Sequence, residues 1–196
     1  ERSIAIKGKV SQKYINLGNA LFGLGDIDGA AAAYKKAVDT DRGSAAAQNN
    51  LGVALHRKGD RAGAEKCYRE AIRIDKNYAA AYSNFGELIF DGGKGDLKKA
   101  FDYLSRAIEL DPNDVHAHYT LGLLHYKNDD SMNGLTSLKK AAELDPKDPD
   151  IQYALGLVLY ARRQTAEARK NFEAALKLDP EHTLSRTALA ALAGKP

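Results

Sequence analysis

The sequence predicts an all-α solenoid in which five repeats, each a pair of antiparallel helices, are followed by one further helix. Three observations predict it: a glycine that recurs at a nearly fixed spacing, small residues that recur at a second phase, and prolines confined to the boundaries between units. The chain has 196 residues, of which 44% are apolar and 28% charged. That composition is ordinary for a globular chain, and the length suffices to bury a core.

The first helix of each unit is marked by a glycine. The spacings between successive glycines are 34, 34, 36 and 34 residues. The glycines are Gly18, Gly52, Gly86, Gly122 and Gly156. Apolar residues recur around each of them at steps of three and four, as Tyr14, Leu17 and Leu21 do around the first, which is typical of one helix face. A period this even over five copies indicates a repeat architecture.

The second helix of each unit carries two small residues with a large apolar residue between them. These triplets are Ala30, Tyr34 and Ala37; Ala64, Tyr68 and Ala71; Ala100, Leu104 and Ala107; Gly134, Leu138 and Ala141; and Ala168, Phe172 and Ala175. Small residues let two helices approach closely, and the large side chain fills the space beside them. We expect the first helices to end near Gly25, Gly59 and the 92–95 stretch, where glycine can adopt a left-handed cap.

These positions divide the chain into an N-terminal segment, five repeats, a capping helix and a tail. In order they are 1–10, 11–44, 45–78, 79–114, 115–148, 149–182, 183–193 and 194–196. The third repeat holds a two-residue insertion in its central turn, and 1–10 is a linker, a helix end or the stub of a longer protein. In the last helix, Leu184, Ala188, Leu189 and Leu192 are expected to cover the open end of the solenoid, with Ser185 and Arg186 on the other side.

The repeat resembles the tetratricopeptide repeat (TPR) over residues 11–182. The resemblance rests on the 34-residue period, the Leu-Gly pair, the two small residues and the closing Leu-Asp-Pro of 109–112, 143–146 and 177–180. It implies a right-handed α-α superhelix whose first helices line a concave groove. It also implies a non-catalytic interaction module or assembly scaffold that binds a peptide or helix of a partner protein in that groove.

Asparagines recur along the expected groove in the first three repeats. Asn16, Asn50 and Asn84 occupy one phase, and Asn49 lies at the neighbouring phase. The column resembles the asparagine ladder in the TPR superhelix of O-linked N-acetylglucosamine transferase. Carboxamides can both donate to and accept from a peptide backbone, which makes these residues candidates for peptide binding. The alternative is that asparagine at this phase serves helix packing.

One specific family function is excluded by the residues at its positions. Some TPR co-chaperones grip the acidic tail of heat-shock chaperones with two asparagines and three cations. Asn19 and Asn50 match the clamp asparagines, so Asn19 joins the candidate binding residues. Ile15, Ala80 and Asn84 stand where the cations would be, so the carboxylates of such a tail would have no partner.

The expected groove changes character in the last two repeats, where it becomes aromatic. The candidate binding residues there are Tyr119, Tyr126, Tyr153 and Tyr160. Tyrosine combines a large contact area with a hydroxyl group, as binding surfaces often do. Glu87 is a further candidate, because it lies in an acidic third repeat that follows a basic second one. The alternatives are that aromatic residues at these phases are common in the family and that the charges are simply solvated.

Composition and motifs exclude several classes of function. A net charge of +3 is too small to indicate a nucleic-acid partner, and no apolar run approaches the length of a membrane span. We find no nucleophile with a base, no phosphate loop and no metal-ligand spacing, since His116, His118 and His125 do not converge. The sequence therefore predicts no enzyme activity, no cofactor and no metal.

Two other interpretations of the chain stay open. It could be the regulatory or substrate-recruiting domain of a larger enzyme such as a glycosyltransferase, or a self-assembling homo-oligomer. The chain starts at Glu1 rather than Met, so a leader or anchor could precede it. We expect a soluble protein, and its compartment stays open between cytoplasm and periplasm.

Overall fold

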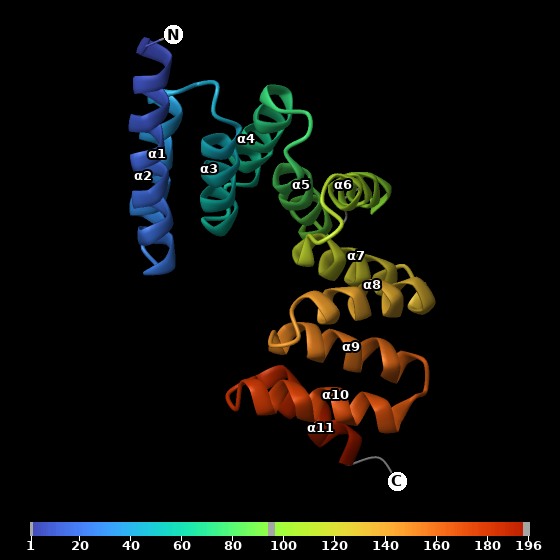
Figure 1. Ribbon diagram of the computed structural model, residues 1–196. Coiled ribbons are helices and arrows are strands. Elements are labelled where there is room, and N and C mark those ends of the chain that lie inside the picture. Colours follow the sequence, from blue (N-terminus) through green and yellow to red (C-terminus); the bar gives the residue numbers. More distant parts are fainter. Residues whose placement is uncertain (1, 94–96, 194–196) are drawn as a thin grey trace. The chain divides into compact units, whose positions relative to one another are not determined.

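The computed structural model describes residues 2–93 and 97–193, which form eleven α-helices and no strand (Figure 1). The helices are α1 (Arg2–Gly23), α2 (Ile27–Thr40), α3 (Ala45–Arg57), α4 (Arg61–Ile74), α5 (Ala79–Asp91), α6 (Leu97–Leu110), α7 (Val115–Lys127), α8 (Ser131–Leu144), α9 (Pro149–Ala161), α10 (Thr165–Leu178) and α11 (Thr183–Ala193). The predicted all-α class is confirmed. Residues 2–10, which match no repeat, are helical and run directly into the rest of α1.

The helices gather into two compact units, unit 1 (residues 1–110, α1 to α6) and unit 2 (residues 111–196, α7 to α11). Within each unit every helix packs against the next along the chain, and short turns make neighbours antiparallel. The first helices of successive repeats also touch, α1 with α3, α3 with α5, and α7 with α9. Each unit therefore presents one face built from first helices. No helix in the described ranges is long and apolar enough to cross a membrane.

Close approach at the recurring glycines holds each helix pair together. A Cβ atom added to Gly52 would lie 2.6 Å from the ring of Tyr68, and one added to Gly86 would lie 2.7 Å from the side chain of Leu104. These distances are far inside van der Waals contact, so only glycine lets the large side chain of the second helix lie against the first. The packing inferred from the small residues is thus what the structure contains.

The turn between the two helices of each repeat contains a residue in the left-handed backbone conformation, with positive φ. Gly25, Gly59 and Gly93 take it in unit 1, with φ of +80°, +82° and +69°. Asp129 and Arg163 take it in unit 2, with φ of 59° and 61°. The glycine cap is therefore replaced by residues with side chains in unit 2. The rest of the insertion in the third repeat (94–96) and the tail (194–196) lie outside the described residues.

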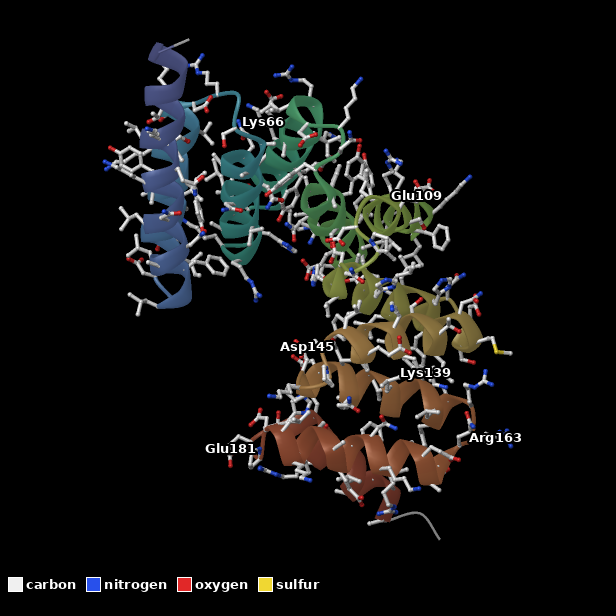
Figure 2. The ribbon with its side chains drawn as sticks, viewed as in Figure 1. Lys66, Glu109, Lys139, Asp145, Arg163 and Glu181 are labelled. Carbon is white, nitrogen blue, oxygen red and sulfur yellow. The ribbon has the colours of Figure 1, made fainter. Side chains whose placement is uncertain are left out.

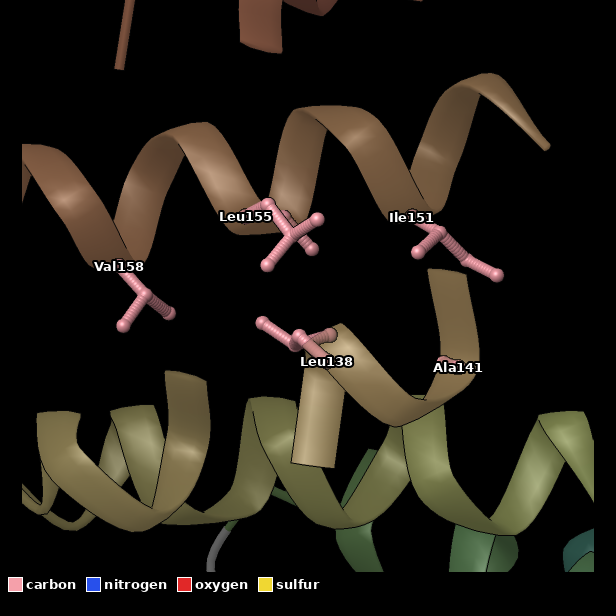
Figure 3. Close-up of a cluster of buried hydrophobic side chains, with 6 residues drawn as sticks. Leu138, Ala141, Ile151, Leu155 and Val158 are labelled. Atoms are coloured by element: carbon pink, nitrogen blue, oxygen red, sulfur yellow. The ribbon is translucent and has the colours of Figure 1, made fainter. Parts of the chain in front are cut away.

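The core of unit 2 is continuous between α8 and α9. Leu138 and Ala141 from α8 meet Ile151, Leu155 and Val158 from α9, and all are at most 6% exposed (Figure 3). Such fully desolvated aliphatic contacts are the main source of stability in a solenoid without disulfides.

The capping helix α11 packs with a different face from the expected one. Ala188, Leu189 and Leu192 do contact the core of the last repeat. Ser185, expected on the outer side, is fully buried, and Leu184, expected inside, is 53% exposed. The reason is that the buried face of α11 starts at Ser185, which takes part in hydrogen bonds at the start of the helix.

Candidate functional site: the face formed by the first helices

A network of four carboxamides joins the first helices of unit 1. Asn50 donates from Nδ2 to Oδ1 of Asn19 (3.3 Å), Asn49 donates to Asn50 (3.2 Å), and Asn84 donates to Asn49 (2.9 Å). We call Asn19, Asn49, Asn50 and Asn84 the asparagine network. Asn49 is buried, Asn50 and Asn84 are half-buried, and Asn19 is exposed. Because each carboxamide has two donors and two acceptor positions, those at the surface keep some hydrogen-bonding capacity.

The network differs in register from the predicted ladder. Asn16 is exposed and accepts a hydrogen bond from Gln12 on its own helix (2.9 Å). Asn19, one turn further along α1, is the residue that reaches Asn50. The structure thus brings together four of the five candidate asparagines and leaves Asn16 apart. In the sequence, the signal for this network was the adjacent pair Asn49 and Asn50. Asn50 contacts α1 and Asn49 contacts α5, so the pair links the two neighbouring first helices.

Two equivalent tyrosines lie beneath this face in different surroundings. The hydroxyl of Tyr34 donates to Oδ1 of Asn19 (2.8 Å). Tyr68 holds the same position in the second repeat, but Val53 replaces the asparagine, and its buried hydroxyl finds no hydrogen-bond partner among the described residues. Burial raises the pKa of the Tyr68 phenol, and the carboxylate of Glu87 raises it further. Glu87 is therefore a half-buried carboxylate that interacts with the Tyr68 phenol, rather than an isolated surface charge.

The tyrosines of unit 2 lie against an apolar core instead. Tyr119 and Tyr126 from α7 pack on the cluster of Leu138 and its neighbours. Burial raises the pKa of the Tyr153 phenol, and the nearby Tyr126 raises it to a smaller extent. Tyr153 also packs its ring 5.7 Å from that of Phe172. The aromatic residues that sequence reasoning placed in one groove are thus neighbours across α7 and α9.

A cleft of about 320 Å³ opens between α9, α10 and α11, and we call it the C-terminal cleft. It is lined by Tyr153, Leu157, Tyr160, Phe172, Leu184, Thr187, Ala188, Ala191 and Leu192. Nearly all of these side chains are apolar. Tyr160 and Leu184 are 37% and 53% exposed, so the cleft offers apolar surface to solvent. Sequence analysis found Tyr153 and Tyr160 but missed the contribution of α11, because it placed Leu184 inside the fold.

A hydrogen-bonded latch fixes α11 beside the cleft. Nδ1 of His182 accepts from the backbone N–H of Ser185 (3.2 Å), which makes His182 the cap of α11. Its Nδ1 also lies 2.8 Å from Oγ of Ser185, and its Nε2 lies 3.0 Å from Oδ1 of Asp150 on α9. The three residue types are those of a Ser–His–Asp triad, but the ring nitrogens are exchanged, because Ser185 lies at Nδ1 and Asp150 lies at Nε2. Ser185 is also fully buried, so a substrate cannot reach its hydroxyl, and the latch is a structural element.

Family models match most of the chain. The model described as "Tetratricopeptide repeat" matches residues 15–79, 119–183 and 153–193, and the one described as "TPR repeat" matches residues 94–129. The chain belongs to the tetratricopeptide repeat family. The resemblance inferred from the period and the Leu-Gly pair is thereby confirmed. A search among curated protein sequences finds no match to this chain.

Solved structures of other TPR proteins are similar over nearly the whole chain. TTC0263, a thermophilic TPR protein of Thermus thermophilus, has 22% identity and a TM-score of 0.79, covering 93% of this chain and 98% of that one. YrrB, a TPR protein described as having an unusual peptide-binding site, has 25% identity and a TM-score of 0.64, covering 89% of each chain. MamA has 26% identity and a TM-score of 0.65, covering 90% of this chain and 95% of that one.

Within this TPR fold, the first-helix face of unit 1 carries no cation at the clamp positions. Ile15 is buried, Ala80 is half-buried, and Asn84 belongs to the asparagine network. In the parts of the chain that the structure describes, no three His, Cys, Asp or Glu residues gather closely enough to hold a metal ion. His118 lies 3.0 Å from the carbonyl oxygen of Pro112, and His125 lies 3.2 Å from a carboxylate oxygen of Asp130. These two histidines have separate partners rather than a common one.

Proposed function

We propose that this TPR chain is a non-catalytic protein-binding module that holds a peptide segment of a partner protein against its first helices. The observation that carries the proposal is the C-terminal cleft. Its lining is almost entirely apolar, and Tyr160 and Leu184 remain exposed at it. Concave apolar surface of this kind is typical of ligand and partner sites.

The lining also points to the chemistry of the partner. A carbonyl or charged group placed in the cleft would lose its water without gaining a hydrogen bond, apart from those that Thr187 and the tyrosine hydroxyls offer. The occupant is therefore a large apolar side chain, supplied by a helix or an extended segment. The rigid rings of Tyr153 and Phe172 pre-form the cavity, which lowers the entropy cost of binding.

The asparagine network supports a second contact of different character. Asn50 and Asn84 have hydrogen-bonding groups left at the surface after forming the network. These groups suit the backbone of an extended peptide, whose N–H and C=O groups do not depend on its sequence. YrrB, at 25% identity, is described as having a peptide-binding site, which agrees with this use of the fold.

The test begins with a random peptide library displayed on phage and selected on the wild-type chain. We expect the selected peptides to carry aromatic or aliphatic anchors. Leu184→Glu and Tyr160→Ala should weaken a selected peptide at least about tenfold, because each removes apolar contact at the cleft. Leu178→Glu is the matched control, since Leu178 is 41% exposed but lies outside the cleft lining.

A parallel pair of variants tests the polar contact. A selected peptide that binds unit 1 should bind Asn50→Ala more weakly than the wild type, whereas Asn16→Ala should not weaken it, because Asn16 stands outside the network. Circular dichroism must show the same helicity for both variants. Peptides without apolar anchors, or binding that ignores Leu184→Glu, would refute the assignment of the cleft.

A further inference from the structure

The outer face of α1 carries an apolar stripe. Val10, Leu17 and Leu24 are 37%, 50% and 82% exposed. They are seven residues apart, so they lie in one line along the helix and just beyond its end. The opposite face of α1, with Ser11 and Ile15, is buried within unit 1. The stripe is therefore surface that the fold of unit 1 does not use.

We propose that this stripe binds the same stripe of a second copy of the chain, with the two α1 helices antiparallel about a two-fold axis at Leu17. The spacing supports this arrangement, because Val10 and Leu24 lie at equal distances on either side of Leu17. In such a pair Leu17 meets its own copy, and Val10 meets Leu24 at both ends. A self-complementary patch of this kind closes into a dimer and leaves no free stripe for further growth.

Charge favours the antiparallel direction. The first half of α1 exposes Lys7, Lys9 and Lys13, and the sequence holds no acidic residue between Arg2 and Gly25. A parallel pair would set these lysines against each other. An antiparallel pair sets Lys7 and Lys9 beside Asp26 and Asp28 of the other copy, at the end of its α1.

The acidic side of this contact is accessible. Asp26 is exposed and caps α2 by accepting from the N–H of Gly29. The side chain of Asp28 is 83% exposed and pairs with Lys58. A carboxylate accepts several hydrogen bonds, so both residues have room for a lysine of the second copy. Antiparallel packing also brings the opposite ends of the two helix dipoles together.

The surface area that two α1 helices can bury against each other sets the expected affinity of the dimer. A 22-residue helix is about 33 Å long, and one helix-to-helix seam of that length buries less than the roughly 1,600 Å² of a standard interface. We therefore expect a dimer that dissociates in the micromolar range. Its formation is independent of the C-terminal cleft, because none of the stripe residues lines it.

The first experiment is sedimentation equilibrium of the full chain across the micromolar range. The wild type should pass from monomer to dimer, and Leu17→Glu should remain a monomer with unchanged helicity. Leu178→Glu, which adds the same charge at another exposed leucine, should still form a dimer. A wild type that stays monomeric throughout, or a Leu178→Glu variant that also loses the dimer, would overturn the proposal.

Disulfide trapping in a Cys67→Ser background tests the geometry. Leu17→Cys should cross-link to itself under mild oxidation. Val10→Cys and Leu24→Cys should not do so alone, since each lies about 21 Å from its own copy, but should cross-link to one another when mixed. Self-cross-linking of all three variants would indicate a parallel pair, and cross-linking of none would indicate another surface. Either result contradicts the antiparallel dimer.

Discussion

Unit 1 and unit 2 are built from the same repeat but differ at the positions that the repeat leaves free. The first-helix face of unit 1 is joined by the asparagine network, whereas that of unit 2 is tyrosine over an aliphatic core. The turns differ in the same way. Unit 1 uses glycine at its left-handed residues, and unit 2 uses Asp129 and Arg163.

The difference between the units shows which positions determine how the helices pack and which determine the chemical character of the exposed face. The contacts of the recurring glycine with the large side chain are the same in both units, and so are the helix pairs, although Gly134 replaces one of the recurring alanines in unit 2. Changes confined to a few first-helix positions convert a hydrogen-bonding face into an apolar one without altering the fold. The chemical character of this face and the fold are therefore largely separable in this chain.

The variants with the largest expected effect on stability lie in the core of each unit. Leu104 in unit 1 and Leu138 in unit 2 occupy equivalent positions and are fully buried (Figure 3 for Leu138). Leu104→Ala and Leu138→Ala should each cost about 2–5 kcal/mol, since each leaves a cavity against a glycine contact. Hydrogen exchange should show the loss of protection in α5 and α6 for the first variant and in α7 to α9 for the second. An equal loss over all helices for both variants would argue against two units.

The latch of α11 is the next test. His182→Ala removes a helix cap and leaves Asp150 and Ser185 without their shared partner, so α11 should lose about 1–3 kcal/mol of local stability. His182→Asn is the matched variant, because asparagine can cap the helix but cannot span to Asp150 in the same way. Exchange rates at residues 183–193 should therefore rank wild type, His182→Asn and His182→Ala in increasing order. The ranking fails if capping contributes nothing to the attachment of α11.

The two equivalent tyrosines give opposite predictions. Tyr34→Phe removes a hydrogen bond to Asn19 and should destabilise the chain by about 1 kcal/mol. Tyr68→Phe removes a buried hydroxyl that has no partner among the described residues, so it should be neutral or stabilising by a similar amount. Urea unfolding of the two variants measures both effects. Equal losses would mean that the hydroxyl of Tyr68 is satisfied in solution.

Exchanging the turn residues sharpens the comparison further. Asp129→Gly and Arg163→Gly should each stabilise unit 2 by up to about 1 kcal/mol, because a side chain is disfavoured at positive φ (Figure 2 labels Arg163). Gly59→Ala in unit 1 should destabilise by a similar amount. Thermal unfolding of the three variants measures these changes in stability, which should be positive for the two variants in unit 2 and negative for Gly59→Ala. A stabilising Gly59→Ala would show that the left-handed turn is not a constraint.

Sequence reasoning predicted the fold better than the site, and the reason is physical. Helix pairs depend on backbone approach, which Gly18 and Gly52 reveal directly because their spacing is periodic. Hydrogen bonds between side chains depend on rotamers and on how neighbouring helices cross. Spacing alone therefore favoured Asn16, whereas the structure uses Asn19 for the contact with Asn50.

The capping helix shows the same limit. Its apolar residues predicted a helix that covers the last repeat, and that helix is present as α11. Its rotation is set by His182, which is polar and lies just before the helix, so it escaped a search based on apolar period. As a result the apolar pattern predicts Leu184 inside and Ser185 outside, the reverse of what the structure contains.

The smallest expected effect concerns the cap of α8. Asp130 accepts from the side chain (2.7 Å) and backbone (3.2 Å) of Asn133, and these bonds, with a smaller contribution from His125, hold its pKa below the ordinary value of 3.8. Because the folded pKa is depressed, the carboxylate stabilises unit 2 above the ordinary pKa, and this contribution disappears as the pH falls through the folded pKa. Asp130→Asn keeps a neutral cap that no longer titrates. The difference between the urea midpoints of wild type and Asp130→Asn should therefore shrink toward zero on acidification, and a difference independent of pH would contradict the role given to the charge.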